Sequence, residues 1–154
     1  MIQICVSEQM LYHRRRTGVW YSYPVSTAAN GTGNRKNSLQ TPLGRHRIEA
    51  KIGAGMPPLT AFRARKACGI FDPCRDDPKL DWILSRIIRL GGCETGRNRR
   101  GAVDTFSRYI YIHGTHDEER LGTPASHGCI RMANDDIIEL FEHVALKEAV
   151  IIRA

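Results

Sequence analysis

The sequence contains no apolar run close to the roughly 20 consecutive residues that a membrane-spanning helix requires. A secretory leader is not visible either, because the first apolar residues precede the basic run Arg14–Arg16 and no apolar signal core follows it. We therefore expect neither a membrane span nor an export signal. The 42% hydrophobic and 25% charged residues are ordinary for a globular protein, so we expect one domain, residues 1–154, without internal repeats.

Cysteine pairs of the C-x-x-C type are also absent, and the five cysteines make an odd number, so at least one is outside any intramolecular disulfide. Cys68 and Cys74 are near enough in sequence to bridge a short loop in an oxidising compartment, and the sequence leaves this open. We expect four buried or incidental thiols and one reactive thiol, because free cysteine usually behaves as a small buried hydrophobe.

The chain has no motif that would direct its positive charge to nucleic acid. Its formal net charge is +7, which fits either a polyanionic neighbour (nucleic acid, anionic lipid or an acidic wall polymer) or a solvated basic surface. The basic residues are dispersed, and no helix-turn-helix, zinc-finger or RNA-binding signature is present. We expect no nucleic-acid partner, and the sequence does not indicate an oligomeric state.

Most of the chain has the pattern of short strands. Short apolar or alternating segments predict strands at residues 2–6, 10–13, 19–25, 46–52, 109–112 and 149–152. The first three are expected to form a meander. The apolar run 82–90 fits either a buried strand or a helix turn, and its isoleucine-rich later part, ended by two glycines, favours a strand. Two segments rich in glycine and polar residues, 26–43 and 94–108, are predicted loops, and 59–78 has no interpretable pattern.

One amphipathic helix is predicted near the end of the chain. Asn134 has the side chain of a good N-cap, and two aspartates follow it where the helix dipole favours negative charge. Apolar residues then recur at helical spacing and predict one buried face, made of Ile137, Leu140, Phe141 and Val144.

The residues with the clearest chemical pattern lie between 109 and 132. The predicted strand ends at His113-Gly114-Thr115, and a polar loop leads to the run Ser126-His127-Gly128-Cys129-Ile130-Arg131-Met132. A thiol becomes a useful nucleophile when a neighbouring base takes its proton. Gly128 permits a sharp bend beside the sulfur and leaves amide N–H groups free for a developing oxyanion. Cys129 is therefore the candidate nucleophile, and His113 the candidate base.

These motifs resemble the catalytic signature of the L,D-transpeptidases, the YkuD-type enzymes that cross-link peptidoglycan. The resemblance extends to a PVST segment and a TP-G segment, matched by Pro24–Thr27 and Thr41–Gly44. His46 departs from the pattern, since the family often has an aromatic residue there. The resemblance implies a mainly β fold, with sandwich- or barrel-like mixed sheets and one or two packed helices.

The resemblance also implies roles for the motif residues. Cys129 would attack, His113 would act as base, and the Gly114 carbonyl would orient the imidazole in place of a triad aspartate. The backbone of His127, Gly128 and Cys129 would form the oxyanion hole.

Ser126 and the arginines have more than one interpretation. Ser126 is expected to hydrogen-bond within the turn, where we group it with the substrate-binding residues. Arg131 is expected either to pair with a substrate carboxylate or to brace the turn. The arginines of the loop before His113 would either hold substrate carboxylates or form a solvated basic surface; they are Arg97, Arg99, Arg100 and Arg108.

The implied reaction is a two-step acyl transfer on peptidoglycan stem peptides. The thiolate forms a thioester with the third stem residue, releases the terminal D-alanine, and passes the acyl group to an amine. With water as acceptor, the same site would be an L,D-carboxypeptidase. No metal or organic cofactor is required. The substrate implies the cell envelope or periplasm, and the lack of a visible export signal leaves action on wall fragments in the cytoplasm as the alternative.

Two other classes of function remain at the level of the sequence. His113, His116, His127 and Cys129 offer soft ligands within one stretch, so a metal-binding module is possible, although zinc ligands usually occur as closely spaced pairs. A non-catalytic wall-binding domain is the other alternative. The presence of both Cys129 and His113 argues against it, because a decayed enzyme would be expected to lose one of them.

Overall fold

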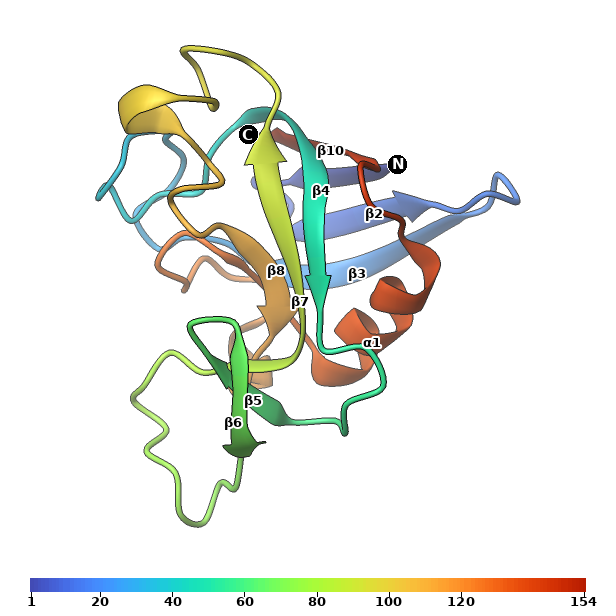
Figure 1. Cartoon of the computed structure of the whole chain (residues 1–154), viewed down its shortest axis with the longest axis vertical. Coiled ribbons are helices and arrows are strands. Elements are labelled where there is room, and N and C mark those ends of the chain that lie inside the picture. The colour runs from blue at the N-terminus through green and yellow to red at the C-terminus, as the bar shows by residue number, and fades with distance from the viewer.

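The structure is a computed structural model that describes residues 1–154, and it contains ten strands and one α-helix (Figure 1). Short 3₁₀ turns lie at Gly101–Val103 and Glu118–Arg120. In chain order the main elements are β1 (Ile2–Cys5), β2 (Met10–Arg14), β3 (Trp20–Ser26), β4 (Gly44–Ile52), β5 (Thr60–Arg63), β6 (Lys66–Ile70), β7 (Ile83–Gly92), β8 (Tyr111–Gly114), β9 (Ile130–Met132), α1 (Asn134–His143) and β10 (Ala149–Arg153).

The strands form one mixed sheet that closes on itself. Their order is β4-β10-β1-β2-β3-β9-β8-β7-β5-β6, and β4 also pairs with β7, which closes a barrel. The pairs β1–β10 and β8–β9 are parallel, and the other strand pairs are antiparallel. The mainly β, barrel-like prediction is confirmed. The helix α1 is too short and too polar to span a membrane.

The strands β7, β8 and β9 separate the core from the candidate site. Ile88, Ile112 and Ile130 are neighbours across these strands and are fully buried in the main core with α1. Because side chains alternate along a strand, the intervening residues lie on the opposite face. We call this opposite face the site face; it carries Ile87, Arg89, Tyr111, His113, Cys129 and Arg131.

The prediction that Asn134 caps the helix is wrong, because α1 begins at Asn134 and Ala133 holds the N-cap position. The Asn134 side chain is buried instead. Its Nδ2 donates to Thr115 O at 2.7 Å, and its Oδ1 accepts from Ser85 Oγ at 2.6 Å. The carboxamide thus joins the helix to β7 and to the segment after β8. The predicted buried face is confirmed for Ile137, Leu140, Phe141 and Val144, the last lying just beyond the helix.

The segment without an interpretable pattern, residues 59–78, contains the hairpin β5–β6. Arg63 pairs with Lys66, so the turn has only two central residues, Ala64 and Arg65, with φ of 45° and 65°. Such turns need positive φ and usually contain Asn or Gly. Because neither residue is of that type, the turn was not recognisable from the residue types.

The strand predicted at residues 109–112 is shifted in the structure. Tyr109 has a φ of 56°, in the left-handed region, and β8 begins only at Tyr111. The apolar alternation continues through Tyr109, so it does not reveal this irregular residue. The consequence is that the Tyr109 carbonyl points towards the site and not into the sheet ladder.

Replacing Asn134 by alanine should lower the free energy of unfolding by about 1–3 kcal/mol, because the buried Ser85 hydroxyl and the Thr115 carbonyl would lose a partner. Urea unfolding at constant pH measures this change. The control is Asn30→Ala, at an exposed asparagine whose side chain makes one 3.4 Å hydrogen bond. Equal effects of the two substitutions would contradict the assigned role.

Candidate active site

Cys129 directly precedes β9 and lies beside the segment Tyr109–Tyr111. The Tyr111 N–H donates to Sγ at 3.4 Å, and the thiol donates to Tyr109 O, also at 3.4 Å. The sulfur packs against a small apolar cluster on the site face that contains Phe62, Ile87 and Tyr111. Burial raises the pKa of the Cys129 thiol to about 12, although the Tyr111 N–H opposes this shift. The thiol is therefore protonated in the resting protein.

His113 lies on the neighbouring strand and on the same face as Cys129. The parallel register pairs Ile112 with Ile130, so these two residues occupy diagonal positions on β8 and at the start of β9. The His113 Nδ1 lies 2.7 Å from Gly114 O, which assigns the proton to Nδ1 and leaves Nε2 as an acceptor. Burial lowers the pKa of His113, against the effects of the Gly114 hydrogen bond and the Asp81 charge. The imidazole is thus a neutral, oriented base.

The turn before Cys129 is fixed by short hydrogen bonds. Ser126 Oγ donates to Cys129 O at 2.5 Å and accepts from the Gly128 N–H at 3.2 Å. Thr41 Oγ1 donates to Gly128 O at 3.0 Å, and Gly128 has a φ of 130° that side chains rarely adopt. Ser126 therefore shapes the turn, as expected.

The free donors of this turn are the backbone N–H groups of His127 and Cys129, which have no partner in the protein. The N–H of Gly128, the third member of the expected oxyanion hole, is already bound to Ser126. Two of the three expected donors are thus available for an oxyanion.

Asp81, in the loop before β7, forms a charged cluster with two residues of the catalytic motif. Its Oδ1 lies 2.7 Å from Arg131 Nη2, and its Oδ2 lies 3.2 Å from His127 Nδ1. Burial disfavours the Asp81 carboxylate, but the Arg131 charge and the hydrogen bond from His127 keep its pKa below the usual value. Nothing in the sequence around Asp81 indicated this contact, because it depends on how the loop folds back onto β9.

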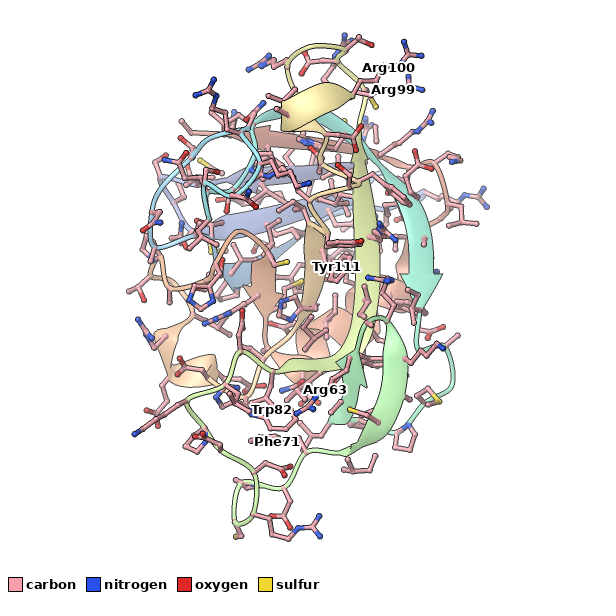
Figure 2. The ribbon with its side chains drawn as sticks, turned by 60° about the vertical axis from the view of Figure 1, so that its left-hand side comes forward. Arg63, Phe71, Trp82, Arg99, Arg100 and Tyr111 are labelled. Carbon is pink, nitrogen blue, oxygen red and sulfur yellow. The ribbon has the colours of Figure 1, made fainter.

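The arginines predicted to bind substrate have mostly other partners. The Arg131 side chain is only 7% exposed and is paired with Asp81, which favours the bracing role. Arg97 pairs with Glu94, and Arg108 donates to Gly33 O, Ser38 Oγ and Gln40 O. Figure 2 places Arg99 and Arg100 at the upper end of the molecule, away from Tyr111.

The remaining histidines and cysteines do not build a second site. No group of three or more His, Cys, Asp or Glu side chains is arranged to hold a metal ion, and His116 Nε2 lies 2.7 Å from Pro78 O. All five cysteines are free, so Cys68 and Cys74 do not form a disulfide. The expectation of buried thiols holds only for Cys5, because the other three outside the motif are exposed.

The comparisons with known proteins agree with this geometry. The family model described as the L,D-transpeptidase catalytic domain, YkuD, matches residues 1–152. A putative L,D-transpeptidase of Bacillus subtilis, YqjB, is 43% identical over 51 residues, which are 33% of this chain and 29% of that protein.

Solved structures show the same fold. An L,D-transpeptidase from Mycobacterium smegmatis aligns with a TM-score of 0.57 and 18% identity, over 99% of this chain and 58% of that one. L,D-transpeptidase 3 from Mycobacterium tuberculosis, in complex with a faropenem-derived adduct, aligns with a TM-score of 0.58 and 16% identity, over 99% and 59%. The chain therefore spans less than two thirds of the length of these relatives. Since the family model matches almost the whole chain, the protein belongs to the YkuD family of L,D-transpeptidase catalytic domains.

Proposed function

We propose that the protein is a cysteine-dependent L,D-transpeptidase that acts on peptidoglycan stem peptides. The observation that carries this proposal is the pairing of β8 with β9, which sets Cys129 and His113 on one face of adjacent strands. The Gly114 carbonyl fixes the imidazole tautomer, so that Nε2 is the basic nitrogen. Family membership supports the reaction class.

Each group of the site has a defined part in acyl transfer. As Sγ attacks the carbonyl of the third stem residue, the thiol proton moves to His113 Nε2. The carbonyl oxygen becomes an oxyanion that accepts hydrogen bonds from the N–H groups of His127 and Cys129. The C–N bond then breaks, His113 returns the proton to the departing D-alanine nitrogen, and a thioester remains on Cys129.

The second step reverses the proton transfers with a new nucleophile. An amine of a neighbouring stem attacks the thioester, gives a proton to His113, and forms the cross-link while Cys129 regains its proton. If water attacks instead, the product is a shortened stem and the enzyme is an L,D-carboxypeptidase. A tetrapeptide donor, incubated with and without a stem-peptide amine, separates the two outcomes by the masses of the products.

The location of the enzyme is inferred from its substrate. We infer that it acts in the cell envelope or periplasm, where peptidoglycan lies, with residues 1–154 as one catalytic domain.

Faropenem should form one covalent adduct with the wild-type protein, because its strained β-lactam carbonyl is an acyl donor and opening of the ring acylates the thiol. Intact mass spectrometry should find no adduct on Cys129→Ala. Cys93→Ala, which removes an exposed thiol from the loop after β7, should react like the wild type. A wild-type adduct that persists in Cys129→Ala, or no adduct on folded protein, would reject the proposed nucleophile.

The acylation rate should depend on pH through His113 and not through a free thiolate. Because burial lowers the pKa of His113 and raises that of Cys129 to about 12, both groups are neutral over the middle pH range. The rate should rise with pH as His113 loses its proton, at a pH below the usual pKa of histidine. It should then stay level to pH 9. His113→Ala should be slower by roughly 10²–10⁴-fold. A wild-type rate that increases tenfold per pH unit up to pH 9 would instead indicate attack by a thiolate formed without the base.

A further inference from the structure

The site face contains arginines that have no carboxylate partner, next to the thiol. Arg65, Arg89 and Arg108 surround Tyr109, and none of the three forms an ion pair, whereas Arg131 is paired with Asp81. Arg108 is occupied by three neutral oxygen acceptors. Arg65 and Arg89, in contrast, each make a single hydrogen bond and keep guanidinium N–H groups without a partner in the protein.

Arg65 contacts the side chains of Tyr109 and Tyr111, the two residues whose backbone groups contact the sulfur. Its guanidinium carbon is 4.8 Å from the centre of the Tyr109 ring, and its Nη1 donates to Tyr111 Oη at 3.1 Å. Tyr109 supplies the carbonyl and Tyr111 the N–H that hold Cys129 Sγ. The Nε and Nη2 of Arg65 make no hydrogen bond in the protein, so one edge of the guanidinium is free.

Arg89 extends the same surface along β7. Its guanidinium carbon is 3.5 Å from the centre of the Phe106 ring and 5.1 Å from that of Tyr109. Its Nη2 donates to Phe106 O at 2.9 Å, and its Nε is buried without a partner. Phe106 and Tyr109 are 42% and 52% exposed, so they form an open aromatic surface between and beside the two cations.

Unusual backbone conformations occur where the hairpin contacts this surface. Ala64, Arg65 and Tyr109 are non-glycine residues with positive φ, a conformation that side chains disfavour. The first two form the tip of the β5–β6 hairpin, and the third places its carbonyl on the sulfur. The hairpin turn thus sets where the Arg65 side chain leaves the backbone, and the Tyr109 conformation directs its carbonyl towards the sulfur.

We propose that Arg65 and Arg89 form a carboxylate-binding subsite beside Cys129, which holds the terminal carboxylate on the leaving side of the donor peptide. A planar guanidinium binds a carboxylate through two parallel N–H bonds, and stacking on an aromatic ring leaves its edge free to do so. A carboxylate one residue beyond the scissile carbonyl lies within about 4 Å of chain length. The identity of the peptide rests on the proposed function, but the preference for a carboxylate does not.

Two alkylating reagents test this preference without any peptidoglycan substrate. Iodoacetate carries a carboxylate next to the reacting carbon, and iodoacetamide is its neutral analogue. The rate at Cys129 is followed by peptide mapping, since three other thiols are exposed. Arg65→Ala should slow alkylation of Cys129 by iodoacetate roughly tenfold or more relative to iodoacetamide, and Arg65→Lys should recover part of the preference.

Arg63→Ala is the matched control. Arg63 comes from the same hairpin and is exposed without an acidic partner, but it lines a separate cavity of about 510 Å³ with Trp82 (Figure 2). Arg63→Ala should keep the wild-type ratio of the iodoacetate rate to the iodoacetamide rate at Cys129. If Arg63→Ala lowers this ratio as much as Arg65→Ala does, the preference for iodoacetate comes from general surface charge. Equal slowing by both reagents in Arg65→Ala, with the thermal unfolding midpoint unchanged, would mean that Arg65 only positions the thiol. Either result overturns the subsite.

A second comparison places the subsite in catalysis. A donor tetrapeptide with a C-terminal amide should lose roughly tenfold in kcat/KM with the wild type, and much less with Arg65→Ala. Equal losses in both proteins would overturn the assignment of the terminal carboxylate. If neither peptide reacts with the wild type, the proposed function fails, while the alkylation result still decides whether the subsite binds carboxylates.

Discussion

The parallel pairing of β8 with β9 is the constraint on which the candidate site depends. The two strands come from segments separated by the long polar loop after Gly114, and their register places Ile112 opposite Ile130. Both isoleucines are fully buried, so a shift of β9 by one residue would move Ile130 to the site face and turn Cys129 into the core. The apolar core thereby fixes the relative position of the candidate nucleophile and the candidate base, although neither takes part in the main core itself.

The charges around the thiol are arranged in two different ways. On one side, Asp81 neutralises Arg131 and accepts from His127, so that the motif arginine braces the catalytic turn. On the other side, Arg65 and Arg89 stack on aromatic rings and have no acid partner. Stacking holds a guanidinium in place without neutralising it. The first arrangement stabilises the turn, and the second leaves positive charge available to a ligand.

Local patterns in the sequence predicted the features that depend on residues close together in the chain, namely most strands, the buried face of the helix and the candidate nucleophile and base. Short apolar and alternating segments indicated β1 to β4, and an isoleucine-rich run that ends at two glycines indicated β7. The helical spacing of Ile137, Leu140 and Phe141 indicated the buried face of α1. The motif singled out Cys129 and His113 through the chemistry of a thiol beside a base. The hairpin β5–β6 was missed because Ala64 and Arg65 adopt a conformation that their residue types disfavour. The contacts of Asp81, Arg65 and Asn134 are all made across distant segments, and no local pattern encodes them.

The resting state of the thiol explains why these distant contacts matter. The Cys129 proton is donated to Tyr109 O, and no hydrogen bond joins Sγ to His113. Burial keeps both groups neutral, so a thiolate–imidazolium pair is not the ground state. In the proposed reaction, attack by Cys129 therefore requires the proton to turn from the Tyr109 carbonyl towards His113 Nε2 when the substrate is present. The Tyr109 ring lies against Arg65 and Arg89, so the surface that we assign to the substrate adjoins the residue whose carbonyl holds the thiol proton.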